Sequence, residues 1–213
     1  MYGLYVITER WQGRSHADVA RAGLAAGAQA IQLREKRMCV RELLATAQEL
    51  REMCARAGAM FIVNDRLDVA LAAQADGMHL GPDDLPVASA RRALLGWERR
   101  RFVIGASAAT VEEAQRAVAD GADYLGVGSI FATDTKPDAG EPIGLQRLGE
   151  IRHAVSLPLV AIGGITAANV AEVITAGADA AAVISAVSRA ADMEAAARRL
   201  ATIIEESRHV RRK

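Results

Sequence analysis

The chain has 213 residues, 51% of them hydrophobic and 4% aromatic, and its formal net charge is zero. This balance gives no reason to expect a nucleic acid or an anionic membrane surface as a partner. No apolar run is long enough to span a bilayer, and residues 1–8 lack the basic start and long apolar middle of a signal peptide. We therefore expect a soluble, cytoplasmic protein whose partners are small molecules, with a homo-oligomer as an open alternative to a monomer.

The two cysteines, Cys39 and Cys54, have no CxxC spacing and lie in helical-looking sequence. In a chain of this size, they predict reduced thiols in a reducing compartment. The chain ends in a basic stretch from about Arg208, which we interpret as a frayed helix end favoured by the helix dipole.

Short β-rich apolar runs alternate with longer amphipathic stretches along the whole chain. Strands are expected at Leu4–Thr8, Ala30–Arg34, Phe61–Asp65, Gly77–Gly81, Val103–Ser107, Tyr124–Ile130, Pro158–Gly163 and Ala180–Ser185. Helices are expected at His16–Ala26, Val40–Ala57, Leu67–Gln74, Pro86–Leu95, Val111–Asp120, Leu145–Val155, Ala167–Ala176 and Asp192–Ser207.

This alternation, without a break in composition, predicts one α/β domain over residues 1–213. Eight βα units in a chain of this length predict a closed (β/α)8 TIM barrel. The alternative is an open, doubly wound sheet, which needs a Gly-rich turn after the first strand that Ile7–Trp11 does not supply. A weak repeat marks the returns from helix to strand, where Gly ends the helix and Ala with Asp forms a tight turn. Its copies are Ala25–Gln29, Ala73–Gly77, Asp120–Tyr124 and Ala176–Ala180.

Polar residues or glycines follow nearly every expected strand, at the end where barrels carry their active sites. Strand alternation directs Gln32, Arg34 and Lys36 to one side, and two cations there are costly without an anionic partner. The other strand ends carry Asn64–Asp65, His79–Asp84, Ser107, Thr133–Lys136, Gly163–Gly164 and Ile184–Ser185.

The stretch 126–144 begins as a buried strand and turns polar within a few residues. Its second half contains Pro137, Gly140, Pro142 and Gly144, which exclude a regular helix or strand. A long polar loop after a barrel strand is typical of an active-site lid.

These polar residues form three chemical groups. Gly163–Gly164 and Ile184–Ser185 lie where barrels commonly bind a phosphate through backbone N–H groups. Two carboxylates, Asp65 and Asp84, suit Mg²⁺, which fills its coordination shell with phosphate oxygens and water. The cations of Arg34, Lys36 and Lys136 suit a second, more highly charged group such as a diphosphate, so we expect group transfer with diphosphate as the leaving group. We expect no Ser-His-Asp set and no nucleophilic cysteine at these strand ends. Covalent catalysis is therefore not expected.

Structural explanations remain open for several of these residues. In the first explanation, Arg34 would only form an ion pair with Glu35 or Asp65 at the rim of the barrel. Asn64 caps the helix that begins near Leu67, and the paired glycines only make a tight turn. We expect His79 to be a hydrogen-bonded core histidine and not a catalytic base.

Taken together, the motifs resemble the thiamine phosphate synthase family from the first strand to the last helix. The matching segments are Gln32–Lys36, Val63–Arg66, Asp76–Gly81 with Asp84, Asp123–Gly128, Thr133–Lys136, Ala161–Ile165 and Ala182–Ala186.

The resemblance implies a transferase that joins 4-amino-2-methyl-5-(diphosphooxymethyl)pyrimidine to a thiazole phosphate. The products are thiamine phosphate and diphosphate, formed by a Mg²⁺-assisted dissociative substitution. It implies that the pyrimidine diphosphate is held by Gln32, Arg34, Lys36, Asn64, Ser107 and Lys136. It further implies Mg²⁺ on Asp65 and Asp84, and the thiazole phosphate on Thr133, Thr135, Gly164, Ile184 and Ser185. The catalytic roles would fall to Lys136, Ser107 and Arg34.

The chain departs from the family pattern at Ala109, at Ser129 and at Pro82–Asp83. Two other functions remain open. A thiazole tautomerase-like isomerase of the same superfamily tends to carry a His where Ser129 stands and to lose the diphosphate and metal residues, which this chain keeps. A non-catalytic thiamine-precursor binding protein is the second alternative.

Overall fold

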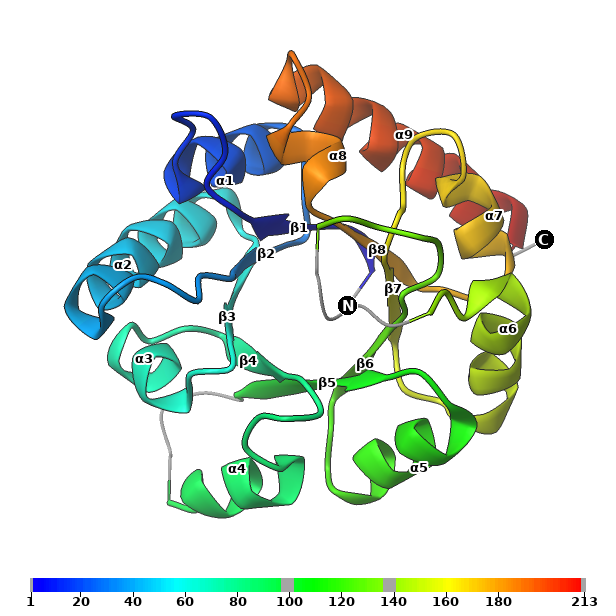
Figure 1. The fold of residues 1–213 in the computed structure, drawn as a ribbon, viewed down its shortest axis with the longest axis horizontal. Coiled ribbons are helices and arrows are strands. Elements are labelled where there is room, and N and C mark those ends of the chain that lie inside the picture. Colours follow the sequence, from blue (N-terminus) through cyan, green and yellow to red (C-terminus); the bar gives the residue numbers. More distant parts are fainter. Residues whose placement is uncertain (1, 97–101, 136–140, 212–213) are drawn as a thin grey trace.

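A computed structural model describes residues 2–96, 102–135 and 141–211. Eight parallel strands follow one another around a closed barrel, and the last strand pairs with the first (Figure 1). The strands are β1 Gly3–Thr8, β2 Ala30–Leu33, β3 Met60–Asn64, β4 Gly77–Leu80, β5 Val103–Ala108, β6 Tyr124–Val127, β7 Leu159–Ile162 and β8 Ala180–Val183. The predicted (β/α)8 barrel is thereby confirmed.

Helices surround the barrel and cover the outer face of its strands (Figure 1). They are α1 His16–Ala25, α2 Val40–Ala57, α3 Leu67–Ala72, α4 Val87–Ala93, α5 Val111–Ala119, α6 Gly144–Ala154, α7 Val170–Thr175, α8 Ser185–Ser188 and α9 Met193–Arg211. Most helix bounds agree with the sequence prediction to within three residues, because Gly stops and cap residues mark the ends.

Strand alternation divides the core into two parts. On β1, Leu4 and Val6 pack outward against the helices, whereas Tyr5 and Ile7 point into the barrel. The inner cluster is small and contains one other large aromatic ring, that of Tyr124. These interior side chains fill the barrel below its C-terminal rim and leave space above them.

The N-terminal end of the barrel is held by three aspartates, which we call the base aspartates. Each precedes a strand, accepts a hydrogen bond from a backbone N–H at the start of the previous strand, and pairs with an arginine. The three sets are Asp76 with Phe61 and Arg51, Asp123 with Ile104 and Arg91, and Asp179 with Leu159 and Arg152. The repeat seen in the sequence is therefore a structural one, because each Asp joins neighbouring strands.

Two parts of the chain differ from the sequence prediction. Strand β6 ends at Val127, not Ile130, and residues 128–131 instead lie against the end of β7, where the amide of Ile130 donates to the carbonyl of Ile162. The short helix α8 was not predicted, because four residues carry too little periodic pattern to identify a helix.

The last helix continues four residues past its expected end near Ser207, into the basic segment predicted to fray. The guanidinium of Arg208 lies 5.0 Å from the centre of the Tyr2 ring. Arg211 donates to the carbonyl of Ala178 at 2.7 Å and pairs with Asp179 at 3.0 Å. Tertiary contacts therefore extend the helix. Among the described residues, no helix combines the length and apolarity needed to cross a bilayer.

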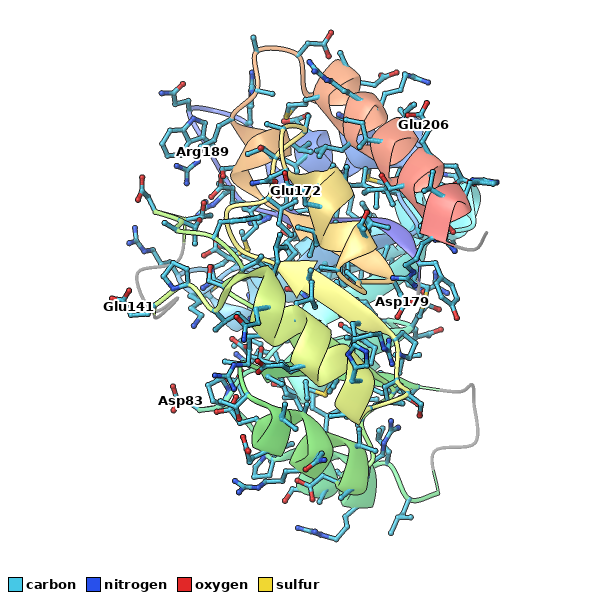
Figure 2. All side chains as sticks on the ribbon, turned by 90° about the vertical axis from the view of Figure 1, so that its right-hand side faces the viewer. Asp83, Glu141, Glu172, Asp179, Arg189 and Glu206 are labelled. Atoms are coloured by element: carbon cyan, nitrogen blue, oxygen red, sulfur yellow. The ribbon has the colours of Figure 1, made fainter. Side chains whose placement is uncertain are left out.

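We predict that Asp179→Ala lowers the free energy of unfolding by roughly 2–4 kcal/mol, because it leaves a backbone N–H and two arginines without their carboxylate. Urea denaturation followed by circular dichroism measures this loss. Asp179 lies at the end of the barrel opposite to Asp83 and Arg189 (Figure 2), so the variant should keep its ligand affinities.

The matched control is Glu194→Ala, which removes an exposed carboxylate paired with Arg198 one helical turn away. Such pairs contribute below about 1 kcal/mol. A loss for Asp179→Ala no larger than that of the control contradicts the role given to the base aspartates.

Candidate active site

A cavity of about 690 Å³ opens at the C-terminal ends of the strands. It is lined by eleven of the thirteen residues predicted to bind substrate or metal. They are Arg34, Lys36, Asn64, Asp65, Asp84, Ser107, Thr133, Thr135, Gly164, Ile184 and Ser185. Gln32 is buried and does not line this cavity, and Lys136 lies outside the described residues.

The cationic side of the cavity follows β2. Arg34 and Lys36 line the cavity, whereas Glu35 between them faces α1. Glu35 accepts from Arg10 at 3.0 Å and lies 3.4 Å from the buried ring of His16. Burial opposes ionisation of Glu35, but hydrogen bonds from the Arg37 amide and His16 outweigh it and lower its pKa. Within the described part of the chain, Arg34 makes no ion pair, so the alternative of a simple rim ion pair is not found and Arg34 lines the cavity.

Two carboxylates face each other beside these cations. Asp65 has a left-handed backbone with φ 63°, and its amide donates to the carbonyl of His79 at 2.9 Å. Asp84 accepts from the amide of Gly81 at 2.7 Å. Burial, followed by contact with Asp84, raises the pKa of Asp65 to about 6, although Lys36 and Arg34 oppose the shift.

Such a carboxylate pair needs a proton or a cation to offset its repulsion, and a hard divalent ion meets this requirement with oxygen ligands. The donor set therefore fits Mg²⁺ with two protein ligands. No larger cluster of His, Cys, Asp or Glu suited to a metal occurs among the described residues. The N-cap of α3 is Arg66, so Asn64 lines the cavity without capping that helix.

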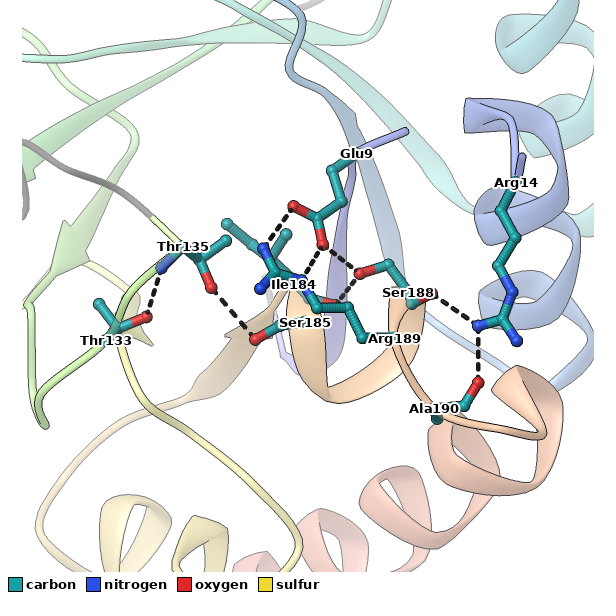
Figure 3. Close-up of polar contacts among 9 residues, drawn as sticks. All are labelled: Glu9, Arg14, Thr133, Thr135, Ile184, Ser185, Ser188, Arg189 and Ala190. Carbon is teal, nitrogen blue, oxygen red and sulfur yellow. Dashed lines mark hydrogen bonds and ion pairs between the residues drawn. The ribbon is translucent and has the colours of Figure 1, made fainter. Parts of the chain in front are cut away.

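The opposite side of the cavity joins the β6 loop to the start of α8 (Figure 3). The Thr135 hydroxyl donates to the Ser185 hydroxyl at 3.1 Å, and the Thr135 amide donates to Thr133 at 3.3 Å. Gly163 and Gly164 have φ values of 100° and 62°. A Cβ on Gly163 would lie 1.9 Å from the Ser129 hydroxyl oxygen, so only glycine allows these loops to approach.

A polar network behind α8 was missed by the sequence analysis (Figure 3). Glu9, just after β1, accepts from Ser188 at 2.5 Å and from Arg189 at 2.9 Å. The Arg189 guanidinium also lies 4.0 Å from the centre of the Trp11 ring. Arg14 donates to the carbonyl of Ser188 at 2.7 Å. These contacts fix α8 against the β1–α1 loop, and no local motif in either segment signals a pairing across the whole chain.

The floor of the cavity contains a serine and a histidine in contact. The Ser107 hydroxyl oxygen lies 3.0 Å from Nε2 of His79. The other ring nitrogen lies 3.1 Å from the hydroxyl of Tyr124. His79 is hydrogen-bonded as we expected, but it is half-buried and lines the cavity, so it is not a core histidine, and its position beside Ser107 was not predicted.

The second half of the predicted lid lies partly outside the described residues, which resume at Glu141. The segment then returns to the barrel, where the amide of Ile143 donates to the carbonyl of Ser129 at 2.8 Å.

Known proteins resemble this chain in sequence and in fold. A family model described as thiamine monophosphate synthase matches residues 4–187. Thiamine-phosphate synthase of Methanoculleus marisnigri is 58% identical over 93% of this chain and 93% of its own, and that of Moorella thermoacetica is 54% identical over 97% and 98%. The solved structure of thiamine phosphate pyrophosphorylase from Pyrococcus furiosus is 43% identical, with a TM-score of 0.89 over 97% of this chain and 96% of its own.

We predict that Asp84→Asn stabilises the metal-free protein at neutral pH. The raised pKa of Asp65 means that its ionisation opposes folding above about pH 6. Removing the neighbouring charge should raise the free energy of unfolding by about 1 kcal/mol after allowance for solvent screening. Urea denaturation in the presence of a chelator measures the gain, which should shrink as the pH falls below about 6 and vanish below the ordinary pKa of 3.8, where Asp65 is protonated in both states.

Asp83→Asn is the control, because Asp83 is exposed and makes no ion pair within the described part of the chain. An equal gain in both variants, or a gain at pH 5 as large as at neutral pH, would show that repulsion from Asp84 is not the cause.

Proposed function

The chain belongs to the thiamine monophosphate synthase family, and we propose that its cavity carries out the transferase reaction. The membership confirms the resemblance predicted from the motifs. The reaction joins the aminopyrimidine diphosphate to the thiazole phosphate. The bond between the pyrimidine methylene carbon and the diphosphate oxygen breaks, and diphosphate leaves with the electron pair. The thiazole nitrogen then donates its lone pair to that carbon, giving thiamine phosphate.

One observation carries the assignment of the diphosphate. Arg34 and Lys36 line the cavity beside Asp65 and Asp84, so unlike charges are gathered at one wall. In the proposed complex, the two cations hold diphosphate oxygens, and Asp65 and Asp84 hold Mg²⁺. Bound there, Mg²⁺ would supply positive charge to stabilise the departing diphosphate. The side chains are already oriented, so this stabilisation requires little reorganisation and is the largest contribution we expect from the protein.

The thiazole phosphate is assigned to the opposite wall. Helix α8 begins at Ser185, and the first N–H groups of a helix have no intrahelical acceptors. Thr133, Thr135 and Gly164 lie across from them. In the proposed complex, the hydroxyl hydrogen bond between Thr135 and Ser185 is exchanged for bonds to phosphate oxygens. This wall is apolar at Ile184, which is buried and helps to keep water from the reacting carbon.

The family assignment favours this transferase over the isomerase and binding-protein alternatives. At the position where the isomerase branch tends to carry a histidine, Ser129 is buried and its hydroxyl donates to the carbonyl of Phe131 at 2.9 Å. Ser129 therefore provides no imidazole ring that could transfer a proton at this position. We further propose that the reaction takes place in the cytoplasm, in keeping with the unpaired thiols of Cys39 and Cys54. A homo-oligomer stays a prediction.

The purified protein, mixed with both precursors and Mg²⁺, should form thiamine phosphate and diphosphate in equal amounts. Arg34→Ala should lower kcat/KM by roughly 10²-fold or more, since it removes a positive charge from the leaving group. Asp84→Ala should lose Mg²⁺-dependent turnover while its circular dichroism spectrum is unchanged.

Glu172→Ala provides the control for loss of a carboxylate and should retain activity within about threefold, because Glu172 is exposed, does not line the cavity, and is weakly coupled to it. Absence of thiamine phosphate with the wild-type protein contradicts the proposed reaction. Full Mg²⁺-dependent activity of Asp84→Ala contradicts only the metal assignment.

A further inference from the structure

Below the cavity floor, five side chains from five different strands form a continuous chain of hydrogen bonds. Gln32 Nε2 donates to the Tyr5 hydroxyl at 2.9 Å, which lies 3.1 Å from the Tyr124 hydroxyl. The Tyr124 hydroxyl lies 3.1 Å from Nδ1 of His79, and Nε2 of His79 lies 3.0 Å from the Ser107 hydroxyl. Only His79 and Ser107 reach the cavity lining. The proposed reaction gives no role to Tyr5, Tyr124 or His79.

Two glycines make room for this hydrogen-bond chain. A Cβ on Gly105 would lie 2.1 Å from the Tyr124 ring, and a Cβ on Gly126 would lie 2.7 Å from the His79 ring. Tyr5 and Tyr124 are 2% and 1% exposed, and burial raises the pKa of both hydroxyls, so each keeps its proton. The two buried tyrosine hydroxyls are paired, and glycines make room for the Tyr124 and His79 rings, so this is a specific arrangement and not a loose filling of the interior.

Proton counting gives the hydrogen-bond chain a direction. The amide nitrogen of Gln32 only donates, so the Tyr5 hydroxyl accepts from it and keeps its own proton to donate. That proton goes to Tyr124, which in turn donates to Nδ1 of His79. The reverse order leaves the buried Tyr5 proton without an acceptor in this chain, at a cost of about 1–3 kcal/mol. A neutral His79 then carries its proton on Nε2 and donates it to Ser107.

We propose that Tyr5, Tyr124 and His79 are positioning residues that make Ser107 a hydrogen-bond donor toward the ligand and thereby set its specificity. Because Ser107 accepts from His79, its own proton points into the cavity. This inference rests on the proposed function, in which Ser107 faces the pyrimidine. An aminopyrimidine presents ring nitrogens with lone pairs, which accept from Ser107. The corresponding 4-oxo ring carries a proton on one ring nitrogen, so two donors meet and binding weakens.

The direction of these hydrogen bonds also determines whether His79 can activate Ser107. A histidine that activates a serine accepts the serine proton. Here His79 donates to the serine, so Nε2 cannot act as its base. The contact therefore belongs to ligand recognition and not to covalent catalysis.

The test uses Tyr124→Phe, which removes the central hydroxyl and keeps the ring against Gly105. Nitrogen-15 NMR of histidine-labelled protein reports which ring nitrogen carries the proton, and the chain has only 4 histidines to assign. The wild type should show His79 protonated on Nε2. Tyr124→Phe should move a measurable part of the population to the Nδ1-protonated form. Tyr2→Phe is the matched control, because Tyr2 is 50% exposed and its hydroxyl is outside the hydrogen-bond chain.

Kinetics supplies the second measurement. Tyr124→Phe should raise KM for the aminopyrimidine diphosphate about tenfold and reduce discrimination against its 4-oxo analogue by a similar factor. KM for the thiazole phosphate should be unchanged, and Tyr2→Phe should match the wild type in every measurement. Tyr5→Phe should show the same changes to a smaller degree, since Tyr124 can still donate to His79.

A wild-type His79 protonated on Nδ1 overturns the proposal. So does a Tyr124→Phe variant whose His79 proton stays on Nε2, or whose discrimination against the 4-oxo analogue is unaltered. Calorimetric binding of both pyrimidine diphosphates separates this failure from that of the proposed function, because it requires no turnover. A protein that discriminates between the two ligands but forms no thiamine phosphate retains the hydrogen-bond chain and loses the assigned reaction.

Discussion

Repulsion between two half-buried carboxylates is the interaction that the rest of the site accommodates. Asp65 and Asp84 come from neighbouring strand ends, and burial together with their mutual contact raises the pKa of Asp65. Arg34 and Lys36 oppose this shift but do not cancel it. The repulsion between the two carboxylates is offset only when a further positive charge binds beside them. The protein therefore holds its carboxylates at an energetic cost that a bound divalent cation would relieve.

The barrel separates that cost from the contacts that hold the fold. At the N-terminal end, the base aspartates join neighbouring strands through backbone N–H groups and arginines, away from the cavity. The interior between the two ends is filled by few large side chains, chiefly Tyr5 and Tyr124. Because the strands are short and parallel, their C-terminal ends meet at one rim, where charge and polar groups interrupt no ladder of backbone hydrogen bonds.

The rim is also the place where distant parts of the chain are joined. Thr135 and Ser185 meet across the cavity, and Glu9 binds Ser188 and Arg189 behind it. Barrel closure explains these contacts, since β8 pairs with β1 and brings the ends of the chain together. The phosphate wall that we propose is thus supported by the first and last βα units at once, which limits the positions open to α8.

The strand order, the barrel and most of the cavity lining could be predicted from the sequence alone, because period-two strands, Gly stops and polar strand ends are local signals. Eleven predicted residues line the cavity for this reason. Contacts between distant segments appear only in the folded chain, because local signals do not encode them. Examples are the short helix α8, the Glu9–Arg189 pair and the contact of His79 with Ser107.

The aspartates of the repeat looked like turn residues, and closure of the barrel made them ties between strands. Tyr124 was predicted only as the start of a strand, and its contact with Tyr5 in the barrel interior placed its hydroxyl in a chain of hydrogen bonds. Such pairings depend on where separate strands stand around a closed sheet, and no stretch of adjacent residues contains that information.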